Sequence, residues 1–316
     1  MLIRRNKVAI VGVGMVGSAT AFSIITQGLC DDVVLIDLND DKANAEALDL
    51  QNCIEYLNRN IKIKGGEFED CADADIVIIT AGAPYIEGQD RLDMLGESVK
   101  IMKSIVTPIM KSGFDGIFII ISNPVDILSF YVQKLSGLPK NQVIGTGTAL
   151  DSARLKNIIA DIIHVDPKSI HAFSMGEHGD SQMVPWSKIV IGGKLFTDIV
   201  RDNPEYESID YDELVKKTTG IAWEIIQAKG ATNYGIASAT AGLVKAILQD
   251  ENRVIPVSTL LEGEYGIHDV YAGVPSVLNR FGVKEVIEIN LPHDEKLKFL
   301  QSIEVLKEFA KKLSFE

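Results

Sequence analysis

The chain has 316 residues, of which 46% are hydrophobic and 24% are charged, an ordinary globular balance that suffices for two domains. Its formal net charge of −13 is expected to repel nucleic acid and anionic membranes. Its apolar runs, such as 75–80 and 116–122, are far shorter than the ~18 residues that a membrane-spanning helix needs. We therefore expect neither nucleic acid nor a membrane as a partner.

The three cysteines, Cys30, Cys53 and Cys71, are odd in number and lack the spacing of a metal site. The N-terminal segment is basic but has no small-residue cleavage site of a signal peptide. These features predict free thiols in a cytoplasmic protein and no bound metal.

The first half of the chain alternates between short apolar runs and helical segments. Such alternation predicts crossover units, a parallel sheet and helices on both faces of that sheet. The expected strands are 8–13, 33–38, 76–80, 117–122 and 143–145, with a helix at about 15–27 after the first strand.

The second half mixes helices with strands of a different kind. Two apolar runs around Gly192 and Gly193 indicate a hairpin over 186–196. The pattern predicts a second, α+β domain, with the boundary near residue 150. The other expected elements are helices at 151–163, 212–228, 232–248 and 294–313 and strands at 253–261 and 270–279.

Gly12, Gly14 and Gly17 follow the first predicted strand and open the first predicted helix. This spacing permits a tight turn, close backbone approach to a pyrophosphate and close packing of helix on strand. The helix N-terminus offers free N–H groups to phosphates. A glycine turn used only for packing is the alternative, whereas a nucleotide kinase loop is disfavoured because no Gly-Lys-Ser/Thr follows.

Asp37 ends the second predicted strand, where an acidic residue can hydrogen-bond a ribose hydroxyl. The same carboxylate would repel the additional phosphate of NADP. Together with the glycine loop, Asp37 predicts NAD as the cofactor.

His178 lies among small residues in a Gly-Glu-His-Gly-Asp-Ser segment, and a lone histidine is more often structural. Upstream, however, Asp151 and Arg154 are three residues apart and share one helix face. An Asp can orient and stabilise a protonated imidazole, and an Arg can hold a carboxylate through two hydrogen bonds. These residue types indicate acid–base chemistry on a carboxylic acid.

Further motifs occur in a fixed order along the chain. Together they make it similar to the L-lactate dehydrogenase and malate dehydrogenase family over nearly its whole length. The matching segments are 12–17, 80–84 (Thr-Ala-Gly-Ala-Pro), 91–92 (Arg-Leu), 123–126 (Asn-Pro-Val-Asp), 150–154, 176–180 and 229–232 (Lys-Gly-Ala-Thr).

The resemblance implies the fold and the assembly. We expect an α/β protein whose residues 1–149 form an NAD-binding Rossmann domain, followed by a C-terminal α+β catalytic domain at 150–316. Family members are usually tetramers, which makes the predicted helix at about 40–57 an interface helix.

The resemblance also implies roles for individual residues. His178 would be the general acid and base, Asp151 its partner, and Arg91 the group that polarises the carbonyl from a mobile loop at about 84–96. Arg91 as a solvated loop charge is the alternative. The implied substrate-binding residues are Tyr85, Arg91, Asn123, Asp126, Arg154 and Thr232. The implied cofactor-binding residues are Gly12, Gly14, Met15, Val16, Gly17, Asp37, Lys42, Phe68, Thr80, Ala81, Gly82, Ala83, Ser104, Ile121, Ser122, Asn123 and Thr146.

Two departures from the family pattern bear on function. Tyr85 stands where lactate dehydrogenases carry Gln and malate dehydrogenases carry Arg, so a dicarboxylate is disfavoured but the chain length of the substrate is left open. Lys156 and His171 occupy the positions that bind fructose 1,6-bisphosphate in some bacterial members. Only His171 matches, and Lys lacks the planar fork of Arg.

The resemblance therefore implies L-lactate dehydrogenase activity. The alternatives are an L-2-hydroxy-acid dehydrogenase for larger substrates such as 2-oxoisocaproate, and a malate dehydrogenase. A catalytically silent NAD sensor is disfavoured because His178, Asp151 and Arg91 are all present.

Overall fold

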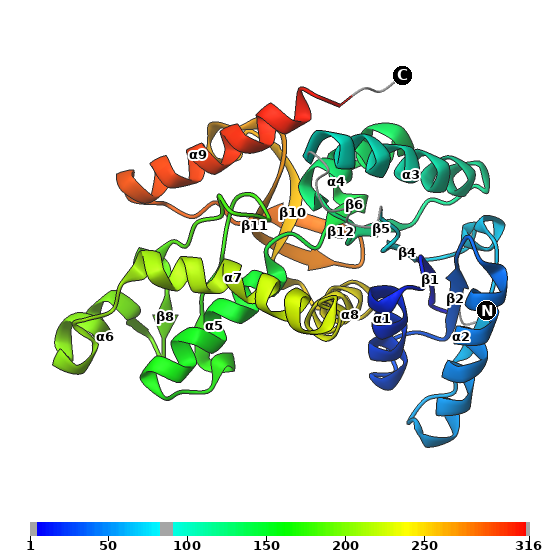
Figure 1. Cartoon of the computed structure of the whole chain (residues 1–316), viewed down its shortest axis with the longest axis horizontal. Coiled ribbons are helices and arrows are strands. Elements are labelled where there is room, and N and C mark those ends of the chain that lie inside the picture. Colours follow the sequence, from blue (N-terminus) through cyan, green and yellow to red (C-terminus); the bar gives the residue numbers. More distant parts are fainter. Residues whose placement is uncertain (1–4, 83–90, 314–316) are drawn as a thin grey trace.

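A nine-stranded sheet runs through the computed structural model, which describes residues 5–82 and 91–313 without the side chains of 91–94 (Figure 1). The strand order is β12-β11-β10-β6-β5-β4-β1-β2-β3, and the six strands of the first half are parallel. These strands are β1 (Lys7–Val11), β2 (Asp32–Ile36), β3 (Lys62–Gly65), β4 (Ile76–Ile79), β5 (Ile117–Ile120) and β6 (Val143–Gly145).

Helices cover both faces of this sheet because its central strands are apolar on both sides. In β4, Val77 and Ile79 face one buried cluster, whereas Ile76 and Ile78 face the other. The first cluster lies under α3 (Arg91–Lys111), α4 (Val125–Ser136) and α9 (His293–Ala310), and the second lies under α1 (Met15–Thr26), α2 (Asp40–Asn52) and α8 (Tyr234–Leu248).

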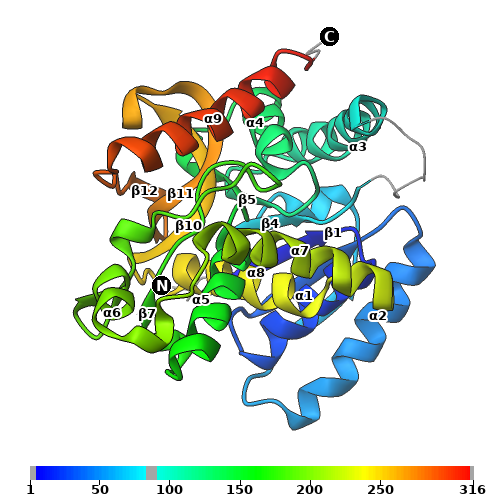
Figure 2. The same cartoon turned by 60° about the vertical axis from the view of Figure 1, so that its left-hand side comes forward.

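The second half of the chain contributes to the same sheet rather than to a separate one. Strands β10 (Arg253–Glu262), β11 (His268–Asn279) and β12 (Gly282–Val286) form an antiparallel extension, which joins the parallel strands where Ser258 pairs with Gly145. Helix α8 packs beside α1, and the two views agree on this (Figures 1 and 2). The predicted Rossmann-type fold and the C-terminal part with mixed helices and strands are therefore confirmed. The two parts contribute strands to one continuous sheet.

A smaller lobe lies beside the sheet and has its own apolar cluster, which includes Trp186 and Phe196. The predicted hairpin is present, with Gly192 and Gly193 in its turn at φ values of 58° and 87°. The lobe comprises α5 (Ala149–Ile163), β7 (Ile170–His171), β8 (Val190–Ile191), β9 (Lys194–Leu195), α6 (Phe196–Asp202) and α7 (Tyr211–Lys229).

Several elements differ from the expectations; β7 and α6, for example, were not predicted. Strands β3 and β12 were not predicted, because both lie at sheet edges and their exposed positions carry polar residues that obscure the strand pattern. The predicted helix at 40–57 ends as an α-helix at Asn52 and continues as a 3₁₀ turn over Cys53–Tyr56. In the described part of the chain, no helix combines the length and apolarity needed to cross a membrane.

Candidate active site

The glycine loop joins β1 to α1 at the carboxyl edge of the parallel strands. Gly12 has a φ of +93°, and a Cβ there would lie 2.7 Å from the backbone nitrogen of Ala81. A Cβ on Gly17 would lie 1.9 Å from the Gly12 carbonyl oxygen, so Gly17 lets the helix pack against the loop. Gly14 differs, because its Cβ would meet nothing within 4 Å. The loop is thus closed on its protein side and open on the side where a ligand would approach.

The N-terminus of α1 is also suited to an anion. Its first turn contains no acidic residue, and its N-cap, Gly14, makes no side-chain capping hydrogen bond. The N–H groups of that turn are therefore not satisfied by a cap and can face phosphate oxygens. This geometry fits the pyrophosphate of a dinucleotide.

Asp37 follows β2 and contacts the same loop. Its Oδ2 accepts a hydrogen bond of 2.8 Å from the Val13 N–H, and its Oδ1 accepts one of 3.1 Å from the Asn39 N–H. The carboxylate therefore orders the glycine loop in addition to its predicted contact with a ribose. The sequence did not predict this second task.

Other residues predicted at the cofactor site follow the carboxyl ends of β4, β5 and β6. The Thr80 hydroxyl donates to the Gly12 carbonyl at 2.6 Å, and the Ser122 hydroxyl donates to the Ala81 carbonyl at 2.5 Å, which ties these segments together. Thr146 is only 3% exposed, so a ligand would meet its backbone rather than its side chain. The segments at this edge are Thr80–Gly82, Ile121–Asn123 and Thr146.

Three predicted cofactor residues, Lys42, Phe68 and Ser104, do not belong to these strand-end segments. Lys42, on the first turn of α2, lines a cavity of about 450 Å³ together with Gly14 and Met15. Ser104 hydrogen-bonds within α3, and Phe68 packs against the core under α3 and α4. The structure gives neither Ser104 nor Phe68 a described contact with the glycine loop.

Asp151 is the centre of a three-residue charged cluster. Its Oδ2 lies 2.7 Å from His178 Nδ1, and its Oδ1 accepts a hydrogen bond of 3.0 Å from Arg154 Nη1. Asp151 is 2% exposed and the Arg154 side chain 9%, whereas 27% of the His178 side chain remains accessible. The structure therefore brings together three residues that sequence spacing alone placed on two separate segments.

The cluster shifts the proton affinities of its members. Burial by itself would lower the pKa of His178, but the Asp151 carboxylate more than offsets this and raises it above its usual value. Burial by itself would raise the pKa of Asp151, but the facing His178 and Arg154 hold it below its usual range. The arrangement therefore favours an imidazolium beside a carboxylate.

Asp126 contacts the backbone of His178 and accepts a hydrogen bond at each of its two carboxylate oxygens. Its Oδ2 accepts the backbone N–H of His178 at 2.8 Å, and its Oδ1 accepts the Ser258 hydroxyl at 2.5 Å. Burial raises the pKa of Asp126 to about 6, although both hydrogen bonds oppose this effect. Each oxygen has one protein donor and can accept another, and Asp126 lines the cavity onto which His178 opens, so its predicted contact with substrate stays a prediction.

His178 opens onto a cavity of about 260 Å³ at the carboxyl end of β5. Asn123 is exposed there, as predicted for a residue that contacts substrate. No residue of the connection between α7 and α8, where Thr232 lies, belongs to the described lining, so the role of Thr232 stays a prediction. The lining consists of Asn123, Pro124, Asp126, Ile127, Glu177, His178, Gly179, Asp180, Leu306 and Phe309.

Three predicted site residues fall partly or wholly outside the description. Ala83 and Tyr85 lie outside the described residues, and Arg91 begins α3 without a described side chain. Their expected contacts stay predictions.

The predicted effector residues lie on neighbouring elements of the smaller lobe. Lys156 is on α5, with Nζ 5.8 Å from the centre of the Phe173 ring, and His171 is exposed on β7. Burial lowers the pKa of Lys156, and Arg253 of β10 lowers it further. Sequence reasoning missed Arg253, which is distant along the chain.

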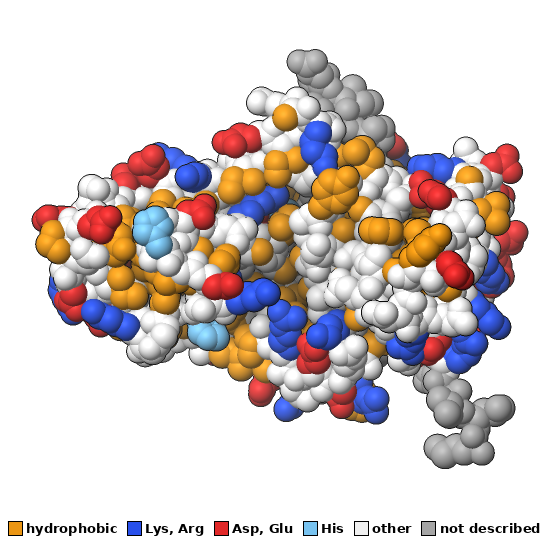
Figure 3. Space-filling model, turned by 90° about the horizontal axis from the view of Figure 1, so that it is seen from below, with side chains coloured by type: hydrophobic (Ala, Val, Ile, Leu, Met, Phe, Trp, Pro, Cys, Tyr) orange, Lys and Arg blue, Asp and Glu red, His pale blue; other side chains and the backbone are white. Residues whose placement is uncertain are grey.

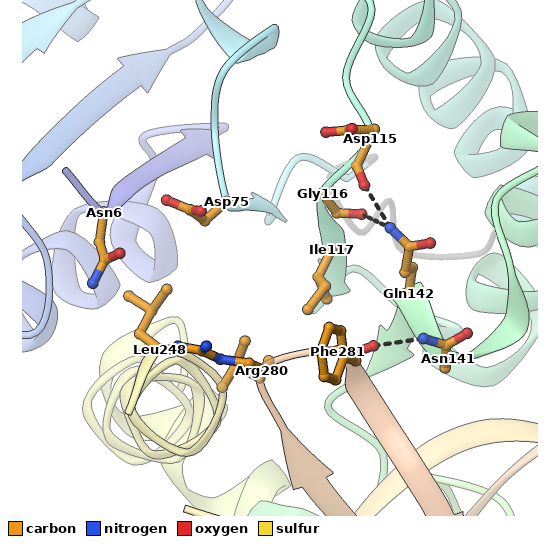
Figure 4. A pocket seen from close by; sticks show the side chains of 11 residues that line it. Asn6, Asp75, Asp115, Gly116, Ile117, Asn141, Gln142, Leu248, Arg280 and Phe281 are labelled. Carbon is orange, nitrogen blue, oxygen red and sulfur yellow. Dashed lines mark hydrogen bonds between the residues drawn. The ribbon is translucent and has the colours of Figure 1, made fainter. Parts of the chain in front are cut away.

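A larger cavity, of about 660 Å³, lies at the opposite, amino edge of the parallel strands (Figure 4). Figure 4 shows Asp75 and Asp115 on one side of it and Arg280 and Phe281 on the other. None of the residues predicted to act in catalysis lines it. We place the candidate active site at the carboxyl edge, because the charged cluster and the glycine loop both lie there.

Comparison with known proteins identifies the family of the chain. Residues 6–145 match the model of the lactate/malate dehydrogenase NAD-binding domain, and residues 148–315 match that of the α/β C-terminal domain of the same family. The chain belongs to the lactate/malate dehydrogenase family. The NAD-binding fold and the NAD-dependent dehydrogenase class that the sequence predicted are thereby confirmed.

Similar members of this family include several L-lactate dehydrogenases. L-lactate dehydrogenase 3 of Bacillus cereus is 51% identical over 311 residues, which is 98% of each chain. L-lactate dehydrogenase of Macrococcus caseolyticus is 50% identical over 302 residues, or 96% of each. The ligand-bound crystal structure of the minor L-lactate dehydrogenase from Enterococcus mundtii superposes with a TM-score of 0.96 at 44% identity, covering 98% of this chain and 99% of that one.

Proposed function

We propose that the protein is an NAD-dependent L-lactate dehydrogenase that interconverts pyruvate and L-lactate. The observation that carries the proposal is the His178–Asp151–Arg154 cluster beside a small cavity, at the same sheet edge as the glycine loop. In this proposal residues 1–149 bind the cofactor and residues 150–316 supply most of the catalytic groups. The names of the similar proteins support it.

His178 is the group that moves the proton. Because its Nδ1 is held by Asp151, Nε2 is left to face the carbonyl oxygen of the oxo acid. The imidazolium form donates a proton to that oxygen during reduction, and the neutral form accepts it during oxidation. When bound, NADH supplies the hydride that reaches the carbonyl carbon.

Arg154 binds the carboxylate of the substrate. Asp151 engages only its Nη1 and fixes the direction of the guanidinium plane. The other nitrogen atoms can then form two parallel hydrogen bonds with a carboxylate. Asn123 and Arg91 complete the substrate contacts in the proposal, and Tyr85 lies at the variable end of the substrate.

The charge of the cavity favours a monocarboxylic acid over a dicarboxylic one. Glu177 and Asp180 line it beside His178, so the second carboxylate of oxaloacetate would meet like charge. Leu306 and Phe309 of α9 provide an apolar wall suited to a methyl group. These features support pyruvate over oxaloacetate, whereas larger 2-oxo acids remain the second candidate because Tyr85 is unusual in the family.

One set of rate measurements tests the proposal. NADH oxidation should be followed with pyruvate, oxaloacetate, 2-oxobutyrate and 2-oxoisocaproate, with and without fructose 1,6-bisphosphate. We expect the highest kcat/KM for pyruvate. A preference for 2-oxoisocaproate would favour the second candidate, a preference for oxaloacetate would favour a malate dehydrogenase, and absence of turnover with all four acids would overturn the proposal.

The same assay tests the cofactor. Asp37 would face the additional phosphate of NADPH, so kcat/KM should be far higher with NADH. Replacing Asp37 with Ser should reduce this preference. Equal use of both cofactors by the wild-type protein would contradict the assignment of Asp37.

The proposal includes a cytoplasmic homotetramer. Large apolar side chains are exposed on α1, α2 and α8, where Phe22 is 51% exposed, Leu48 is 69% exposed and Tyr234 is 73% exposed. Seen from below, the surface carries several apolar side chains in its central part, where α1 and α8 lie (Figure 3). Such a surface supports self-association through these helices.

A further inference from the structure

The segment that carries His178 is held by three different elements. The backbone of Gly176 exchanges two hydrogen bonds with Gly273 of β11, at 2.9 and 2.8 Å. The Glu177 N–H donates to the Ser302 hydroxyl of α9 at 2.8 Å, and the His178 N–H donates to Asp126 of α4 at 2.8 Å. Of these contacts, only the one with Asp126 is made by His178 itself, and it is the only one whose partner is a charged side chain.

Asp126 in turn is fixed from the opposite side. The Ser258 hydroxyl of β10, which is completely buried, donates to the second carboxylate oxygen of Asp126. Asp126 is 3% exposed, so solvent screens its charge only weakly. The carboxylate therefore joins α4, the antiparallel extension and the His178 segment at one point.

We propose that Asp126 is a positioning residue for His178, which holds the backbone of His178 in place and stabilises the protonated form of its ring. This role is distinct from that of Asp151, which contacts the ring directly, and from the substrate contact expected from the sequence. Only the expected effect of Asp126 on turnover rests on the proposed function.

The charged groups around the ring agree with this role. Asp151 and Arg154 act on His178 from α5, and Asp126 acts on it from α4. Glu177, on the same segment as His178, acts on Asp126. The anchoring hydroxyls from β10 and α9, those of Ser258 and Ser302, are uncharged. Asp126 is therefore the second negative charge that raises the pKa of His178, after Asp151.

Replacing Asp126 with Asn separates charge from shape. The amide oxygen can still accept the His178 N–H, and the amide nitrogen can donate to a Ser258 hydroxyl that has rotated to accept. The hydrogen bonds can thus survive while the negative charge is lost. We expect the pKa of His178 to fall by ~0.5–1 unit, less than for a carboxylate that contacts the ring itself.

A matched control exists at the opposite edge of the sheet. Asp75, labelled in Figure 4, accepts the backbone N–H of Lys7 at 2.8 Å, the same kind of contact that Asp126 makes with His178. Asp75→Asn should leave the His178 titration unchanged. A similar shift in both variants would overturn the specific role of Asp126.

The readout is an NMR titration of the imidazole Cε1–H of His178 without cofactor, assigned by its absence in His178→Asn. An unchanged His178 midpoint in Asp126→Asn would also overturn the proposal. Should Asp126→Asn fail to fold, the wild-type protein decides, because its His178 signal should show a second inflection near pH 6, where Asp126 takes up a proton. A wild-type curve with one inflection would then overturn the proposal.

Steady-state rates link this role to turnover. If the proposed function holds, Asp126→Asn should lower kcat for pyruvate reduction at pH 7.5 by ~3- to 10-fold, the most that a fall of ~0.5–1 unit in the pKa of His178 allows, and leave KM nearly unchanged. Absence of wild-type turnover would remove the proposed function but leave the NMR result valid, so the two failures are distinguishable.

Discussion

Asp151 shows how a single buried charge can organise a site. It is almost completely buried, yet its two oxygens face His178 and Arg154, so its charge is compensated by direct contacts. The same contacts fix the tautomer of His178 and the orientation of Arg154. A buried carboxylate without these partners would instead take up a proton.

Asp151→Asn should therefore change the pH dependence of the reaction. Removing the carboxylate lowers the pKa of His178, so the imidazolium needed for reduction is lost at a lower pH. We expect pyruvate reduction to fall with a midpoint ~1 pH unit or more below that of the wild type, and lactate oxidation to begin at correspondingly lower pH. Profiles of kcat/KM against pH measure this shift.

Asp161→Asn is a control for that change, because Asp161 is exposed near the far end of the same helix. Its profile should match the wild type. An unshifted profile in Asp151→Asn would mean that Asp151 does not set the proton affinity of His178.

Arg154→Lys keeps the positive charge but loses the planar pair of donors. We expect substrate binding to weaken by ~1.5–3 kcal/mol, the scale of a hydrogen bond to a charged group, while NADH affinity stays nearly constant. The KM for pyruvate and the Kd for NADH, measured by fluorescence titration, test this expectation. A wild-type KM in the lysine variant would exclude Arg154 as the carboxylate ligand.

At the scale of elements, the β1–α1 unit illustrates two uses of glycine. Gly17 is needed for the packing of α1 against its own loop, whereas Gly14 faces open space. Gly14 has a φ of −72°, which other residues can adopt, so its lack of a side chain is not required by the backbone. The two positions therefore separate a requirement of the fold from a requirement of the cofactor.

Gly14→Ala and Gly17→Ala should affect different properties of the protein. Gly17→Ala should lower the Tm of the cofactor-free protein, because the added methyl group would overlap the Gly12 carbonyl. Gly14→Ala should leave that Tm unchanged but weaken NADH binding about tenfold, since the methyl group would occupy the space of the pyrophosphate. Thermal unfolding and NADH titration of both variants measure this, and unchanged NADH affinity in Gly14→Ala would argue against this loop as the pyrophosphate site.

At the scale of the whole molecule, one sheet connects the two halves of the chain. The antiparallel strands β10 to β12 continue the parallel sheet, and α8 covers the same face as α1. This arrangement brings Ser258 of the second half against Asp126 of the first. Helices α1, α2 and α8 cover the same buried cluster of the sheet, and each carries an exposed apolar side chain.

Charged substitutions at these exposed side chains should break the proposed assembly. In the double variant Phe22→Glu and Leu48→Glu, association would bury unpaired carboxylates, which is costly. Sedimentation velocity should show a smaller species than the wild type. Leu297→Lys is the control, since this side chain is 47% exposed on α9 and its variant should sediment as the wild type does. A wild-type protein that sediments as a monomer would contradict the tetramer.

The sequence by itself determined the features that depend on local spacing. These features include the glycine loop, in which Gly14 and Gly17 follow Gly12 by two and five residues, and the acidic residue at the end of the next strand. They also include Asp151 and Arg154, which lie about one helical turn apart. The parallel core strands were predictable for the same reason, because a run of buried apolar residues is itself a local pattern.

Only the tertiary structure decided which distant residues meet. The contact of Asp126 with His178 joins residues 52 apart, and that with Ser258 joins residues 132 apart. The attachment of β10 to β6 likewise depends on how two halves of the chain pack, and edge strands β3 and β12 gain their partners only within the assembled sheet. No periodicity encodes such contacts, because they are selected by the packing and hydrogen bonding of the folded chain as a whole. The engagement of both Asp126 oxygens behind His178 is therefore a property of the fold, although the residue types that achieve it are written in the sequence.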